Sequence, residues 1–159
     1  MLQEKKFYLT KEGLKKITKE FQELKELKLA KTSGDVPKML QSEDVNMEYL
    51  TFQEDMEALE RRIQELDLVL KNYEIIKPPA KGKDDTVYLG SKVYLKDDQG
   101  NKVEYKLVGT LEADPFDGKI SNESPVGKAL LGRKVGEVVA MINANGLNYK
   151  ILKVFQGEA

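Results

Sequence analysis

Apolar residues recur at alternating steps of three and four through the second quarter of the chain. They occupy Tyr49, Phe52, Met56, Leu59, Ile63, Leu66, Leu70 and Tyr73. The same spacing runs upstream through Leu14, Ile17, Phe21 and Leu24. Such spacing is typical of the seam of a coiled-coil helix, and Thr10 is placed to cap the first of the two helices. The pattern predicts an antiparallel helical hairpin in which each seam buries the other.

The helical pattern ends at KPPAKGKDD, residues 77–85. Two prolines, a glycine and mixed charges cannot continue a helix, and they indicate an interdomain linker. The chain is therefore expected to form a hairpin over residues 1–76 and a second domain over residues 86–159.

The second domain carries the signals of a small, mostly antiparallel β-sheet. Residues 86–109 alternate β-branched, aromatic and polar side chains around a Gln-Gly-Asn turn, which predicts a β-hairpin. Residues 135–154 predict a second hairpin around an Asn-Gly turn. Between them, Ser124-Pro125 favours the start of a short helix that Gly132 ends. The predicted fold class is α+β, with an α-helical hairpin followed by a β domain with one short helix.

Composition excludes several kinds of chemistry. The 159 residues contain no Cys and no His, which rules out thiolate zinc sites, disulfides and His-based acid–base catalysis. No segment approaches the roughly 20 apolar residues that span a bilayer, so a cytoplasmic protein without membrane contact, a monomer, is expected. The net charge of -1 argues against a nonspecific polyanion binder, although it leaves room for local basic faces.

Acidic residues gather in QSEDVNMEY, residues 41–49, at the far end of the expected hairpin. Glu43, Asp44 and Glu48 lie within six residues of one another, with no basic residue among them. One interpretation is that they make a loop more soluble and stabilise the N-terminus of the second helix, where the macrodipole favours anions. The other is that the hairpin carries carboxylates to a distant site.

Several segments resemble the bacterial Gre transcript cleavage factors of the GreA and GreB type. SNESPVGKALLGRKVGEVV, together with VGTLEAD at residues 108–114, is similar to their C-terminal domain, which has an FKBP-like fold. NMEYLTFQEDMEALERRIQELDLVL, residues 46–70, resembles their second coiled-coil helix, and YLTKEGLKKITKEFQEL resembles the first. The resemblance extends over nearly the whole chain and is poor between about Leu29 and Val45.

The resemblance implies a transcription elongation factor whose partner is bacterial RNA polymerase. Its coiled coil would enter the secondary channel while the C-terminal domain holds the channel's rim. Two carboxylates at the tip would help the polymerase hold a second Mg²⁺ beside the 3′ end of backtracked nascent RNA, and the polymerase's own active site would cleave that RNA. Mg²⁺ prefers oxygen ligands, which fits carboxylates. The chain itself would be no enzyme and would have no cofactor of its own, since this Mg²⁺ is shared with the polymerase.

The tip departs from the family pattern Gly-Asp-Leu-x-Glu-Asn-x-Glu-Tyr. Without gaps, Asn46, Glu48 and Tyr49 match its end as tip-supporting residues, but the two metal-directed acids then fall on Ser42 and Val45. Other alignments give three candidate catalytic acids. Deleting two residues before Asn46 matches Asp44 to the family's Asp, with the neighbouring Glu43 as the second metal ligand in place of the family's Glu. Alternatively, Gly34-Asp35 is a displaced Gly-Asp pair, which makes Asp35 the third candidate.

The segment before the acids is expected to be irregular. Gly34 and Pro37 are predicted to break the first helix, with a restarted turn near Pro37 and with Met39 and Leu40 packed beneath it. Asp35 would then either approach the other acids or act only as a helix cap.

Two further sets of residues follow from the resemblance. Lys38, Arg61 and Arg62 are candidates for contact with RNA, or they belong to a solvated face of alternating charges. Asp114, Ser124 and Pro125 are candidates for polymerase binding, although each also suits a local turn or helix start.

Two functions remain open from the sequence. The first is a factor that stimulates transcript cleavage, and the second is a related regulator that occupies the channel without supporting cleavage. Prolyl isomerase activity is not expected, because the second domain shows no apolar pocket rich in aromatic residues.

Overall fold

The computed structural model describes residues 5–41, 44–77, 79, 82–140 and 146–156. Contacts within the chain define two units. The helical unit is Leu14–Asn72, and the β unit combines Met1–Gly13 with Tyr73–Ala159. Within the described ranges, no helix has both the length and the apolar character needed to cross a bilayer.

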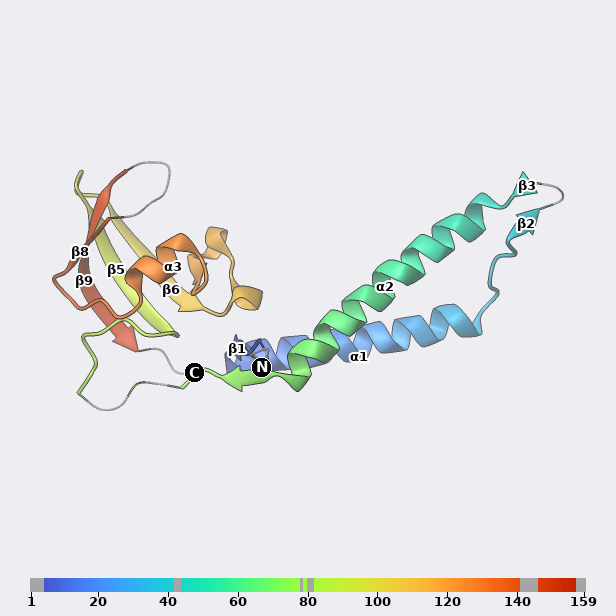
Figure 1. Cartoon of the computed structure of the whole chain (residues 1–159), viewed down its shortest axis with the longest axis horizontal. Coiled ribbons are helices and arrows are strands. Elements are labelled where there is room, and N and C mark those ends of the chain that lie inside the picture. The colour runs from blue at the N-terminus through green and yellow to red at the C-terminus, as the bar shows by residue number, and fades with distance from the viewer. Residues whose placement is uncertain (1–4, 42–43, 78, 80–81, 141–145, 157–159) are drawn as a thin grey trace. The chain divides into compact units, whose positions relative to one another are not determined.

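The helical unit is a hairpin of α1 (Lys11–Ser33) and α2 (Met47–Lys71), whose ribbons are shown in Figure 1. Ion pairs between the helices join Lys28 to Glu60 at 3.3 Å and Lys31 to Asp55 at 3.7 Å. Higher numbers on α1 meet lower numbers on α2, as an antiparallel arrangement requires. The predicted hairpin is therefore confirmed.

The predicted seam is the buried stripe of this hairpin. Ile17, Leu59 and Leu66 are buried, and the other seam positions within the helices are half-buried. Tyr73 is the exception, because α2 ends before it and its side chain is 41% exposed. Its assignment to the seam was wrong, since Asn72 closes the helix by donating from its backbone N–H to the Val69 carbonyl.

The β unit contains a five-stranded sheet in the order β7-β6-β5-β9-β8. Its strands are β5 (Ser91–Asp97), β6 (Lys102–Val108), β7 (Lys119–Ser121), β8 (Val138–Ala140) and β9 (Asn148–Gln156). Neighbouring strands are antiparallel except β6 and β7, so both predicted hairpins are confirmed in the described residues. The first residue of the predicted Asn-Gly turn, Asn145, lies outside them.

One face of the sheet forms the core of the β unit. Alternate residues of its strands point inward and pack with Leu130 of the short helix α3 (Pro125–Leu130). The buried members are Val87, Val93, Leu95, Leu107, Leu130, Val139 and Ile151. Because strand side chains alternate between faces, the residues between them lie on the opposite face.

A small parallel ladder adds the two ends of the hairpin to the β unit. The strand β1 (Phe7–Leu9) precedes α1 and pairs with β4 (Tyr73–Ile75), which follows α2. The side chain of Leu9 is fully buried. The sequence-based division placed both segments with the hairpin, whereas their pairing groups them with the β unit.

The start of α1 is fixed by a residue distant in sequence. Thr10 caps the helix as predicted, with its Oγ1 accepting from the Gly13 N–H at 3.0 Å. Glu112, at the end of the 3₁₀ turn η1 (Thr110–Glu112), accepts from the Thr10 N–H at 2.8 Å and from the Thr10 hydroxyl at 2.6 Å. A Cβ at Gly13 would collide with this carboxylate, and one at Gly109 would collide with the Tyr8 carbonyl.

We expect Glu112→Gln to lower the free energy of unfolding by about 1–3 kcal/mol, because the amide keeps only one acceptor for two donors and loses the charge. Chemical denaturation followed by circular dichroism measures this loss. Glu54→Gln, at an exposed position on α2, is the matched control and should be close to neutral. Equal stability of the two variants would contradict the role given to Glu112.

Candidate functional site

The tip, residues 34–46, begins where α1 ends. Ser33 is the last helical residue, and the hydroxyls of Thr32 and Ser33 donate back to carbonyls of the preceding turn. Gly34 and Pro37 follow, so the predicted break in the helix is confirmed. The restarted turn near Pro37 was wrong, because the described residues continue into the short strand β2 (Leu40–Gln41), which pairs with β3 (Asp44–Val45).

Asn46 organises the tip. Its side-chain oxygen accepts from the Glu48 N–H at 3.0 Å and caps α2, while its Nδ2 donates to the Lys38 carbonyl at 3.0 Å. Its backbone N–H donates to the Met39 carbonyl, also at 3.0 Å. One residue thus ties the start of α2 to the incoming segment. These bonds also explain the extended path there, since a helical turn would use the same carbonyls internally.

The candidate acids are distributed along this tip. Asp35 and Asp44 are exposed, and Glu48 occupies the first turn of α2, where the helix dipole favours a negative charge. Glu43 lies outside the described residues. Among those described, no group of three or more Asp, Glu, His or Cys side chains is arranged to hold a metal ion. Metal binding by Asp44 and Glu43, with Asp35 nearby, therefore stays a prediction.

Apolar side chains are also exposed around the tip. Met39 is 59% exposed, Val45 51% and Met47 71%. The expectation that Met39 packs beneath the tip was wrong, because its side chain is largely exposed, and the side chain of Leu40 lies outside those that the structure describes. Tyr49 is half-buried in the first turn of α2, so it supports the helix end rather than the surface.

The three basic candidates have different surroundings. Arg62 binds Glu20 of α1 through two nitrogens, at 2.7 and 3.1 Å, and lies 3.4 Å from Glu65. Hydrogen bonding with Glu20 raises the pKa of the Arg62 guanidinium above its usual value. Arg61 and Lys38 are exposed. The charge of Arg62 is thus engaged between the helices, and contact with RNA stays a prediction for all three.

The second candidate surface lies in the β unit. Ser124 Oγ accepts from the Gly127 N–H at 3.0 Å and donates to the Ser121 carbonyl at 2.7 Å, so it caps α3, and Pro125 is the exposed first residue of that helix. Asp114 accepts from the Phe116 N–H at 3.1 Å and starts the 3₁₀ turn η2 (Pro115–Asp117). The predicted local roles of all three residues are confirmed.

Sequence reasoning missed Phe116. Its side chain is fully exposed at the middle of η2, and this turn is closed on both sides. Asp114 and Lys119 exchange two backbone hydrogen bonds of 2.9 Å, and Gly118 adopts a left-handed conformation with φ of 70°. Aromatic side chains are enriched in protein contact surfaces, so this exposed ring is a candidate contact residue. The Asp-Pro-Phe-Asp-Gly run, an Asx turn followed by glycine, was the available signal.

Both units match models of transcription elongation factors. The model described as "Transcription elongation factor, N-terminal" matches residues 7–75, and "Transcription elongation factor, GreA/GreB, C-term" matches residues 82–156. The chain therefore belongs to the GreA/GreB family of transcription elongation factors.

Curated relatives agree with this assignment. The chain is 40% identical to transcription elongation factor GreA of Clostridium acetobutylicum, over 97% of this chain and 99% of the relative. It is 41% identical to GreA of Lachnoclostridium phytofermentans, over 95% and 96% of the two chains. A solved structure of GreA factor homolog 1 of Thermus thermophilus is 27% identical, with 94% of this chain and 99% of that one covered and a TM-score of 0.43.

We expect Arg62→Ala to destabilise the hairpin and Arg61→Ala to leave it nearly unchanged, because of these two arginines Arg62 is the one that pairs with α1. The difference should be modest, under about 1 kcal/mol, since the pair is partly exposed and screened by solvent. Thermal unfolding followed at the helical circular dichroism signal measures it. Equal unfolding midpoints would show that the cross-helix pair contributes nothing to stability.

Proposed function

We propose that this chain binds bacterial RNA polymerase and stimulates cleavage of backtracked RNA by the polymerase active site. The observation that carries the proposal is Asp44, an exposed carboxylate at the tip of the helical hairpin in a member of this family. Helix α2 has 25 residues and so is roughly 37 Å long, which gives the hairpin the reach to deliver a carboxylate far from its base. The chain would not itself be the nuclease.

The donor chemistry of the tip suits the Mg²⁺ that this function requires. A carboxylate oxygen is a ligand that Mg²⁺ prefers, and an exposed side chain can add itself to an ion held mainly by another protein. Mg²⁺, when bound, favours attack of water on a phosphodiester. Asp44 would hold the ion, with Glu43 as second ligand, while Asn46 ties the segment before the acids to the start of α2.

A second function is favoured by one observation at the same place. Met39 and Val45 in the tip, and Met47 beside it, expose apolar side chains, and among the described residues no three acids are arranged to hold a metal ion. A tip of this kind would occupy a channel by apolar contact without assisting cleavage. The experiment below separates the two functions.

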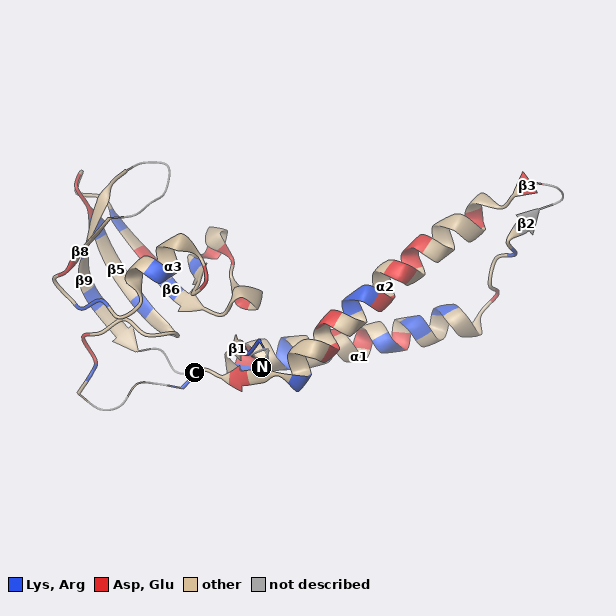
Figure 2. Ribbon diagram, viewed as in Figure 1, with Lys and Arg blue, Asp and Glu red and all other residues tan. Residues whose placement is uncertain are grey.

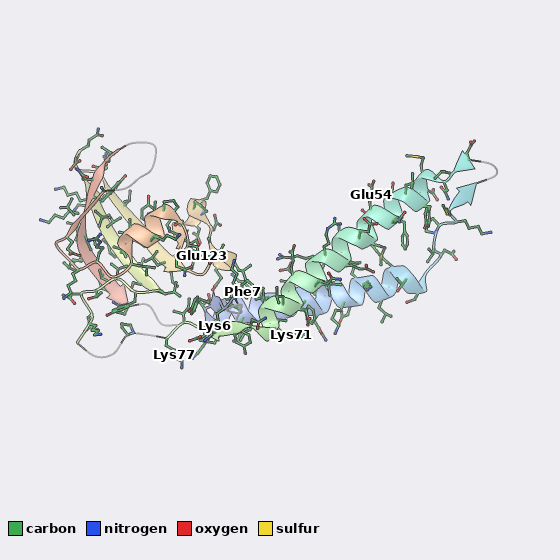
Figure 3. All side chains as sticks on the ribbon, in the orientation of Figure 1. Lys6, Phe7, Glu54, Lys71, Lys77 and Glu123 are labelled. Atoms are coloured by element: carbon green, nitrogen blue, oxygen red, sulfur yellow. The ribbon has the colours of Figure 1, made fainter. Side chains whose placement is uncertain are left out.

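We expect Asp44→Asn to reduce cleavage of labelled RNA in stalled, backtracked complexes at least about tenfold, because the amide keeps the volume but loses the charge that attracts the cation. Glu43→Gln should reduce it less. The assay is run at several Mg²⁺ concentrations, and binding of each variant to polymerase is measured in parallel. Glu54→Gln on α2 (Figure 3) is the control and should cleave like the parent chain.

Binding without cleavage by the parent chain, at every Mg²⁺ concentration, would favour the second function. Full activity of the doubly substituted chain, Asp44→Asn with Glu43→Gln, would show that these two acids are solvated residues without a role in cleavage.

We expect Phe116→Ser to weaken polymerase binding more than the tip substitutions do, if the β unit holds the polymerase. The ring makes no buried contact, so its loss should not change stability, whereas Ser124→Ala would also remove a helix cap worth about 1 kcal/mol. Titration of labelled polymerase measures affinity. Val138→Ser, another exposed apolar position, is the matched control. Unchanged affinity of the Phe116 variant would remove this turn from the binding surface.

A further inference from the structure

The five-stranded sheet has an open face, opposite the core that packs against α3. Residues paired directly across neighbouring strands lie on the same face. On its three central strands, the open face traced by this register includes Lys92, Tyr94 and Lys96 of β5, Lys102, Glu104 and Lys106 of β6, and Lys150, Lys153 and Phe155 of β9. Neither candidate site described above uses any of them.

This face is strongly basic although the chain is not. On these three strands it holds six lysines and one glutamate, whereas the whole chain has 26 basic and 27 acidic residues. Glu104 pairs with Lys92 at 2.5 Å. In the part of the chain that the structure describes, the other five lysines form no ion pair. Figure 2 shows the basic positions repeated along the strands.

Several of these lysines lie opposite one another on neighbouring strands, which destabilises the sheet. Lys92 lies directly opposite Lys106, and Lys96 lies opposite Lys102 on one side and Lys150 on the other. Neighbouring strands are about 4.8 Å apart, and like charges directly opposite each other are destabilising. An extended anion bound across the strands would relieve this repulsion.

Aromatic rings lie among these charges. Tyr94 and Phe155 meet edge to face, with centroids 5.6 Å apart, and Phe155 is 52% exposed. The Lys92 ammonium lies 5.9 Å from the Tyr94 ring. Single-stranded nucleic acid combines regularly spaced phosphates with bases that stack on aromatic side chains, so it complements both features. An acidic peptide would complement only the lysines.

We propose that the open face binds single-stranded nucleic acid, with lysines on the phosphates and Phe155 under a base. This activity is separate from the function proposed above, because it needs neither the tip nor polymerase. The sheet supplies few hydrogen-bond groups that read bases, so binding is sensitive to salt and tolerant of sequence.

The test is fluorescence anisotropy of a labelled oligouridylate with the full chain in the absence of polymerase. Lys150→Glu with Lys153→Glu should weaken binding at least about tenfold at low salt. The control, Lys128→Glu with Lys134→Glu, makes the same charge change at exposed positions outside the open face and should weaken it less than about threefold. For about four phosphate contacts, log K should fall with log salt with a slope of about -3, and the first variant should make it shallower.

Phe155→Ala separates stacking from charge. It should weaken binding several-fold without changing the salt slope, and circular dichroism confirms that each variant is folded. The proposal is overturned if the parent chain does not bind at low salt, or if both charge-reversed pairs weaken binding equally. It is also overturned if polyglutamate competes as well as unlabelled oligouridylate, or if duplex DNA binds as tightly as the single strand.

Discussion

The contact between Glu112 and Thr10 fixes the start of α1 within the β unit. The N–H groups of a helix's first turn have no partners within the helix, and a buried end needs other acceptors. Here the Thr10 hydroxyl serves the Gly13 N–H, and Glu112 binds Thr10 in turn. The contact needs glycine at two positions, because a side chain at Gly13 or Gly109 would occupy the space of the carboxylate or of the chain beside it. The same group of atoms therefore forms the cap of α1 and a long-range contact within the β unit.

Local signals in the sequence predicted most helices and strands. The features that they missed depend on contacts between residues far apart in the sequence. The seam of α2 and the predicted caps at Thr10 and Ser124 depend on residues a few positions apart. The ladder of β1 and β4 joins two three-residue strands, one before α1 and one after α2 in the sequence. Each is too short to show an alternating pattern. Tyr73 illustrates the limit, since the apolar spacing continues one step beyond the end of the helix.

The candidate site was predictable as residue types and not as geometry. An acidic tip follows from the sequence, but the path of residues 34–40 is set by Asn46, which binds the carbonyls of Lys38 and Met39 from the other side of the tip. No local propensity encodes that closure. Arg61 and Arg62 are adjacent and chemically identical, yet only the second meets Glu20 on the other helix. Whether Arg62 is available to a ligand depends on this contact between distant residues, so it could not be predicted from the sequence.

The helical hairpin and the sheet differ in which charges they place opposite each other. Across the hairpin, lysines and an arginine of one helix face acids of the other, as in the pairs Lys28–Glu60, Lys31–Asp55 and Glu20–Arg62. Across the described strands of the sheet, lysine faces lysine at four places. The hairpin thus places opposite charges across its helices, whereas the sheet places like charges across several of its strands. Because an unbalanced surface interacts with anions far more strongly than a balanced one, the electrostatic behaviour of the molecule follows from the strand register and not from its net charge.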